Sequence, residues 1–241
     1  MPIKEFKIMG ARCLSIKTLA EYKDYIIDLL ESKKGGYSVA INAEKVMLYQ
    51  NNEEIKNIID NAILPSPDGV GALIGLKLLH NEKAIKVDLP KTILEIANSK
   101  GYKLFVLGAT NEVNKLAVET IRKRYPNILL VGNNDGFFKN DNEMINQIVS
   151  SKPQIIMAAL GTPKQEILAV QINNELPSAL IIGCGGALDV LAGKVKRAPM
   201  FFQNLHLEWF YRLASNPTRI KRQKVLPIFL FKIIKMAIFK K

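Results

Sequence analysis

The sequence predicts an α/β protein in which a mostly parallel sheet is flanked by helices and followed by a basic helical C-terminal appendage. Two observations carry this prediction. Short β-like runs alternate with stretches of helical period, and the positive charge gathers at one end of the chain. The hydrophobic fraction of 48% in 241 residues supplies a core for one large domain, with or without an appendage.

Short apolar runs that precede turn or loop signals are predicted as strands. They are residues 6–9, 38–41, 103–107, 128–131, 154–160 and 179–182. Helical periodicity predicts helices at residues 18–32, 111–124, 141–150 and 163–174. This alternation is typical of a Rossmann-like parallel sheet covered by helices. Residues 42–98 are predicted to be mainly helical, which leaves open that the two halves form distinct lobes.

The net charge of +12 is concentrated near the C-terminus. Residues 190–241 hold 12 Lys and Arg against one acid, Glu208, whereas residues 1–189 hold 22 against 21. We therefore predict a near-neutral body at residues 1–195 and a basic appendage at residues 196–241 that sits on something anionic.

The composition also bounds the setting of the protein. Residues 1–10 lack the apolar region of a signal peptide. Cys13 and Cys184 lie far apart, which favours a reduced cytosolic setting. His80 and His206 stand alone, and no Cys/His cluster has metal-ligand spacing.

Ligands of parallel sheets bind beyond the carboxyl ends of the strands, so the turns after the predicted strands are candidate sites. Asn42 opens a helix after residues 38–41, and taken alone it reads as a helix cap. Gly108, Ala109 and Thr110 follow residues 103–107, where small residues before a helix suit a phosphate.

Two further turns are unusual. Gly161 precedes Thr162 and Pro163, a plausible helix start, but the polar run Lys164-Gln165-Glu166 exceeds what capping needs and favours a ligand contact. After residues 179–182, Gly183, Gly185 and Gly186 would allow a close backbone approach, yet the spacing matches neither a P-loop nor a dinucleotide fingerprint. Cys184, between these glycines, reads as a packing residue.

Asp68 stands outside this pattern, in a rigid turn between prolines and glycines at residues 65–71 that enters a helix at residues 72–79. From the sequence alone, a turn or cap carboxylate and a general base are equally acceptable interpretations.

Together these pieces resemble the WecG/TagA/CpsF glycosyltransferases, glycosyltransferase family 26, along most of the chain. The resemblance rests on Asn42-Ala43-Glu44, Pro67-Asp68-Gly69-Val70-Gly71, Val87-Asp88-Leu89, Leu107-Gly108-Ala109, Gly161-Thr162-Pro163-Lys164-Gln165-Glu166, Gly183-Cys184-Gly185-Gly186-Ala187-Leu188-Asp189, Gly193, Arg197-Ala198-Pro199 and Leu207-Glu208-Trp209-Phe210-Tyr211-Arg212-Leu213.

The resemblance implies an inverting, metal-independent transfer from a UDP-sugar, such as UDP-N-acetylmannosamine, to N-acetylglucosamine on undecaprenyl diphosphate. Such products serve teichoic acid, polysaccharide or capsule synthesis. It also implies a cytoplasmic enzyme that is peripheral on the inner face of the cell membrane. A homo-oligomer is possible, and a nucleic-acid partner is not expected.

When the family's roles are carried over position by position, the resemblance implies that Asp68 is the general base. It also implies that Asn42 and Gln165 are polar residues of the catalytic pocket. The nucleotide would lie near Gly108, Ala109, Thr110, Gly161, Gly185, Gly186 and Lys83. The sequence departs from the family pattern at Ala40, where a Thr is usual, at Lys83, where an Arg is usual, and at Lys86, where a Gly is usual. These departures support an alternative, a catalytically weakened nucleotide-sugar-binding protein.

The appendage is predicted as a helix at residues 200–214, a basic segment at residues 218–226, an interruption at Pro227 and an apolar segment at residues 228–241. Lysines at 221, 224, 232 and 235 would form one stripe if the segments stay coaxial. Lys232 and Lys235 break the apolar run, so docking in the membrane interface is favoured over a spanning helix.

Packing of the appendage against the body, an oligomer contact and nucleic-acid binding remain alternatives. Arg197, Arg212, Arg219 and Arg222 are candidate contacts to the acceptor diphosphate or the membrane.

Overall fold

The computed structural model describes residues 3–196, 198–199 and 225–239. Its centre is a six-stranded sheet in the order β4-β3-β8-β7-β5-β6, with every neighbouring pair parallel. The strands are β3 (Gly36–Ile41), β4 (Leu64–Pro67), β5 (Lys103–Gly108), β6 (Leu129–Asn134), β7 (Ile155–Ala159) and β8 (Leu180–Gly183). The predicted fold class is confirmed, and one sheet joins both halves of the chain, so separate lobes are not formed.

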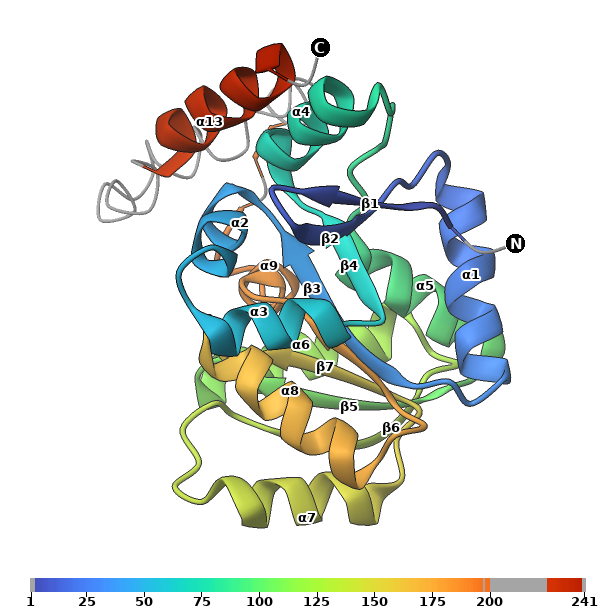
Figure 1. Ribbon diagram of the computed structural model, residues 1–241. Coiled ribbons are helices and arrows are strands. Elements are labelled where there is room, and N and C mark those ends of the chain that lie inside the picture. The colour runs from blue at the N-terminus through green and yellow to red at the C-terminus, as the bar shows by residue number, and fades with distance from the viewer. Residues whose placement is uncertain (1–2, 197, 200–224, 240–241) are drawn as a thin grey trace.

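Helices cover both faces of this sheet (Figure 1). They are α1 (Leu19–Glu31), α2 (Ala43–Tyr49), α3 (Glu53–Asn61), α4 (Gly69–His80), α5 (Leu89–Lys100), α6 (Asn111–Arg124), α7 (Asp141–Ser151), α8 (Lys164–Glu175), α9 (Ala187–Leu191) and α13 (Val225–Phe239). The strands alternate between two cores. In β5, Phe105 packs toward the core with α2, α3, α4, α7, α8 and α13, while Leu104 packs toward the core with α1, α5, α6 and α9. Burial on both faces explains why the central strands read as nearly continuous apolar runs.

Two strands differ from the sequence prediction. Residues 65–71 were expected to form a rigid turn, but residues 65–67 belong to β4, the edge strand that pairs with β3. Proline donates no hydrogen bond to a sheet, and an edge strand tolerates it because one side of the strand needs no partner. The predicted run at residues 6–9 falls on β1 (Glu5–Ile8), which pairs antiparallel with the unpredicted β2 (Ala11–Leu14), outside the main sheet.

The C-terminal helix α13 lies beside α4 (Figure 1) and also contacts α2. Its Phe229 and Ile233 are fully buried in the core on that side of the sheet. Gly71 of α4 lies close to this helix, and a Cβ there would make a tight contact of 3.3 Å with Cε1 of Phe229. Pro227 lies within α13, which is continuous over its described residues, so the expected interruption at this residue is wrong. The helix predicted at residues 200–214 and the segment at 218–224 lie outside the described residues.

Phe229 should be the main side chain that anchors α13. We expect Phe229→Ala to lower the free energy of unfolding by about 3 kcal/mol, because it opens a cavity in a packed interface. Phe231→Ala is the matched control on the same helix, since Phe231 is 70% exposed and its loss should change stability little. Urea unfolding measures both, and equal effects would contradict the packing of α13 described above.

Candidate active site

The candidate residues gather at one edge of the sheet because its strands are parallel and their carboxyl ends share that edge. Asn42 follows β3, Asp68 follows β4, Ala109 follows β5, Gly161 lies in the turn after β7 and Cys184 follows β8. Asp68, which seemed to stand outside the strand pattern, obeys it once β4 is recognised as a strand. The helices after neighbouring strands β3 and β8 pack on opposite faces of the sheet, which is where doubly wound folds bind ligands.

Asn42 and Asp68 follow neighbouring strands. In the parallel register Ile41 is the partner of Pro67, and the backbone N–H of Asp68 donates to the carbonyl oxygen of Ile41 at 2.8 Å. Asn42 caps α2, because its Oδ1 accepts from the backbone N–H of Lys45 at 3.0 Å. The cap interpretation of Asn42 is therefore confirmed, and its catalytic role stays a prediction.

Asp68 occupies the cap position of α4, but its side chain makes no capping hydrogen bond. The carboxylate is 48% exposed, and Lys86 Nζ stands 3.8 Å from its Oδ1. Gly69, which follows with a φ of 78°, would place a Cβ in open space. The carboxylate is thus free of a capping role and accessible to a substrate beside it.

The glycines of the site turns serve two different purposes. Gly161 and Gly185 have positive φ angles of 76° and 47°, and a Cβ at either would meet nothing within 4 Å. Gly108 also has a positive φ, 116°, but a Cβ there would lie 2.3 Å from the carbonyl oxygen of Ala159. Gly161 and Gly185 therefore border open space, whereas Gly108 is required by the packing of β5 against β7.

The turn after β5 is held internally. The backbone N–H of Ala109 donates to the carbonyl oxygen of Ala159 at 3.0 Å, and Thr110 caps α6 through Val113. An anion at this turn would therefore meet the first N–H groups of α6, which a helix leaves without intrahelical partners. Asn114, buried and not recognised from the sequence, donates to the carbonyl oxygens of Gly108 at 3.0 Å and Asn134 at 2.7 Å.

The start of α8 carries a buried polar cluster. Glu166 forms an ion pair of 2.6 Å with Lys45, although 121 residues separate them, and its Oε1 also accepts from Gln165 Nε2 and Thr162 Oγ1. Gln165 was predicted in the pocket, but Lys45 and Glu166 were not chosen as site residues. The sequence offered one signal, a charged residue directly after Gln165 within the polar run.

Cys184 is a packing residue, as predicted. Its Sγ lies 3.3 Å from the carbonyl oxygen of Ala158, and burial raises the pKa of the thiol to about 12. A thiol with this pKa stays protonated near neutral pH and is a poor nucleophile.

Comparison with known proteins decides the family. Residues 6–241 match the glycosyl transferase WecG/TagA/CpsF family. This chain is a member of that glycosyltransferase family. It is 32% identical to the N-acetylglucosaminyldiphosphoundecaprenol N-acetyl-beta-D-mannosaminyltransferase of Bacillus spizizenii strain W23, over 86% of this chain and 81% of the relative. It is also 32% identical to the protein of the same name from Bacillus subtilis strain 168, over 90% of this chain and 86% of that relative.

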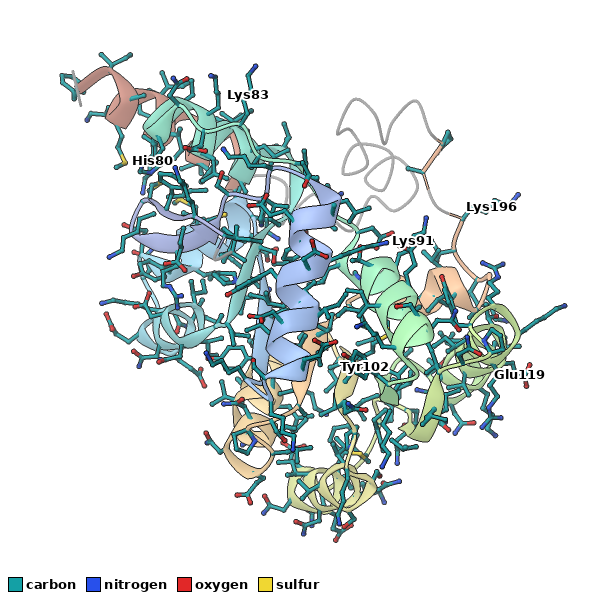
Figure 2. All side chains as sticks on the ribbon, turned by 90° about the vertical axis from the view of Figure 1, so that its right-hand side faces the viewer. His80, Lys83, Lys91, Tyr102, Glu119 and Lys196 are labelled. Carbon is teal, nitrogen blue, oxygen red and sulfur yellow. The ribbon has the colours of Figure 1, made fainter. Side chains whose placement is uncertain are left out.

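Two lysines that follow α4 in this glycosyltransferase, Lys83 and Lys86, have different surroundings. Lys83, predicted near the nucleotide, is exposed, and Figure 2 shows its side chain directed away from the body. Lys86 is the lysine that approaches Asp68. The nucleotide role of Lys83 stays a prediction, and Arg197, Arg212, Arg219 and Arg222 lie outside the described residues.

The described part of the glycosyltransferase contains neither a cluster of metal-ligating side chains nor a membrane-spanning helix. No three His, Cys, Asp or Glu side chains lie together as metal ligands within the described ranges. Within the same ranges, no helix has the length and hydropathy needed to cross a membrane.

The two kinds of glycine predict different outcomes of alanine substitution. Gly108→Ala should lower the free energy of unfolding by several kcal/mol, because the new Cβ overlaps the backbone of β7 at a positive φ. Gly161→Ala is the matched control and should cost only about 1–2 kcal/mol, the strain of its positive φ. Urea unfolding measures the difference, and equal losses would show that the close approach at Gly108 is not restrictive.

Proposed function

We propose that this chain transfers N-acetylmannosamine, or a related sugar, from a UDP-sugar to N-acetylglucosamine on undecaprenyl diphosphate, in teichoic acid, polysaccharide or capsule synthesis. The relatives support the acceptor and the transferred sugar, because their names state both. The single observation that carries the proposal is the Asp68 carboxylate. It lies at the carboxyl end of β4, is half exposed and makes no capping bond.

In the proposed reaction Asp68 is the general base of an inverting displacement. Its carboxylate takes the proton from the attacking hydroxyl of the acceptor while that oxygen bonds to the anomeric carbon of the donor. The bond between this carbon and the diphosphate oxygen breaks, and UDP leaves with the electron pair. Inversion follows because the attacking and leaving oxygens occupy opposite faces of the sugar.

The departing diphosphate needs positive charge or hydrogen-bond donors nearby. The first turn of α6, after Thr110, offers backbone N–H groups and the positive end of a helix dipole. Lys86 offers positive charge beside Asp68. We propose that these groups act without a metal ion, so that transfer continues in the presence of EDTA.

Substitution of Asp68 tests the proposed base. We expect Asp68→Asn to lower kcat about a hundredfold or more, because the amide cannot accept the proton, while UDP still binds. Asp24→Asn, an exposed aspartate on α1, is the matched control and should keep full activity. Transfer from UDP-N-acetylmannosamine to a short-chain lipid diphosphate acceptor is the measurement. Near-normal turnover of Asp68→Asn would remove Asp68 from the mechanism.

The same assay separates the alternative function. A weakened nucleotide-sugar-binding protein, suggested by Ala40 and Lys83, would bind UDP but transfer no sugar across a panel of donors.

We also propose that α13 docks on the membrane that carries the acceptor, which makes the protein peripheral on its inner face. One side of the helix is buried against α4 and α2, and the other exposes large apolar side chains. They are Ile228, Phe231, Ile234, Met236, Ile238 and Phe239. Lys232 and Lys235 are exposed among them, and each adds roughly 1 kcal/mol of attraction near an anionic surface. Exposed aromatic and aliphatic side chains flanked by lysines are suited to the lipid interface.

The docked helix would lie close to the proposed base. Phe229 of α13 lies beside Gly71, where an added Cβ would come within 3.3 Å of its ring, and Gly71 is about one helical turn beyond Asp68 in α4. A membrane-bound α13 would therefore hold the start of α4 near the surface where a lipid-linked acceptor presents its sugar.

Charge placed on the exposed face of α13 tests this docking. We expect Phe231→Glu with Phe239→Glu to abolish sedimentation with phosphatidylglycerol vesicles, because carboxylates oppose both burial in lipid and the anionic surface. Phe137→Glu is the control, since Phe137 is also exposed, at 74%, but precedes α7. Retained vesicle binding by the double variant, or binding of the wild type to duplex DNA in preference to vesicles, would contradict the proposal.

A further inference from the structure

A buried ion pair lies among the candidate pocket residues. Lys45 of α2 and Glu166 of α8 are 5% and 3% exposed, and Gln165 beside them is 8% exposed. Charged side chains are rarely buried so completely unless they are paired, and the Nζ of Lys45 is 2.6 Å from Oε1 of Glu166. The mechanism proposed above uses neither charge.

The position of this cluster places it at the site. Lys45 lies in the first turn of α2, which Asn42 caps, and Glu166 lies in the first turn of α8. Gln165 reaches the end of β8, because a Cβ on Gly183 would lie 2.9 Å from its Nε2. The cluster therefore joins the carboxyl ends of β3, β7 and β8, the three adjacent strands whose turns form the centre of the candidate site.

Among the described residues, one oxygen of the Glu166 carboxylate receives three hydrogen bonds and the other receives none. Its Oε1 accepts from Lys45 Nζ at 2.6 Å, Gln165 Nε2 at 2.9 Å and Thr162 Oγ1 at 3.2 Å. Because the Lys45 ammonium is buried and needs this carboxylate, Glu166 cannot turn away without leaving a charge unpaired. The carboxylate is thus a fixed acceptor for the amide of Gln165.

This contact determines which way the Gln165 amide points. An amide offers N–H donors on one side and a carbonyl acceptor on the other. The N–H side faces Glu166, since the reverse would bring the carbonyl oxygen against a carboxylate. Gln165 Oε1 must then point elsewhere, and it is buried without a hydrogen-bond partner among the described residues, as is Glu166 Oε2. Buried acceptors in folded proteins nearly always receive a hydrogen bond, so a donor from outside the described residues is expected here.

We propose that Glu166, held by Lys45, is a positioning residue that presents the carbonyl oxygen of Gln165 to the sugar of the donor substrate. The inference rests on the proposed transfer of a sugar from a UDP-sugar. A hydroxyl or an acetamido N–H of that sugar can donate to Gln165 Oε1. The ionised diphosphate cannot, because its oxygens are acceptors and have no proton to donate to another acceptor. The cluster therefore selects the sugar and contributes nothing to holding the diphosphate.

The test compares the equilibrium binding of UDP and of UDP-N-acetylmannosamine by titration calorimetry. In Lys45→Met with Glu166→Met, two apolar side chains replace the ion pair without leaving a buried charge, a change that proteins often tolerate. We expect the melting temperature and the affinity for UDP to stay near their wild-type values. The affinity for UDP-N-acetylmannosamine should fall about tenfold, as expected from losing one oriented hydrogen bond.

Gln165→Leu is the second variant, and it leaves the ion pair intact. It should also lower the affinity for UDP-N-acetylmannosamine while leaving the affinity for UDP near its wild-type value. This variant keeps the test decisive if the double variant does not fold. The matched control is Lys100→Met with Glu31→Met, which removes an exposed ion pair of 2.7 Å and should change neither affinity.

Three results would overturn the inference. The first is an equal loss of affinity for UDP and for the UDP-sugar, and the second is no loss of affinity for either ligand. The third is a loss of affinity for the UDP-sugar alone in Gln165→Leu that the double variant does not show. The first two are expected if a buried water, and not a sugar, satisfies Gln165 Oε1. Because binding is measured without turnover, a wild-type chain that prefers the UDP-sugar over UDP but transfers nothing would fail the proposed function and leave this inference standing.

Discussion

The parallel pairing of β3 with β4 on one side and β8 on the other is the constraint on which the site depends. Parallel strands end at the same edge of a sheet, so this pairing brings together turns from distant parts of the chain. Asn42 and Asp68 become neighbours, and the turn at Gly183–Gly186 lies next to them. The β7–β8 pairing adds the start of α8 with Gln165 and Glu166.

The helices that follow these strands connect the site to the rest of the molecule. Asn42 and Asp68 occupy the cap positions before α2 and α4, and both helices contact α13. The core that seats Phe229 is therefore the same core that holds the two helices carrying candidate catalytic residues. The proposed membrane-facing helix α13 therefore packs against α4, the helix that follows the proposed base.

Much of the fold could be predicted because its central strands are buried on both faces and read as apolar runs. β4 escaped prediction because its Pro65 and Pro67 resemble turn residues, and only its place at the edge of the sheet makes them acceptable. β2 escaped because a four-residue strand with Arg12 inside it has little apolar signal. Pro227 suggested an interruption, yet α13 is continuous through it over the described residues.

The sequence by itself determined the alternation of strands and helices, the basic C-terminus and the series of motifs that belongs to the WecG/TagA/CpsF family, since each is a local property of the chain. Only the tertiary structure decided that Asp68 follows an edge strand beside Asn42, that Lys86 rather than Lys83 approaches it, and that Lys45 meets Glu166. These contacts join residues far apart in sequence. A charge pattern alone does not show which lysine will be buried against which carboxylate, because that depends on how the sheet aligns its turns.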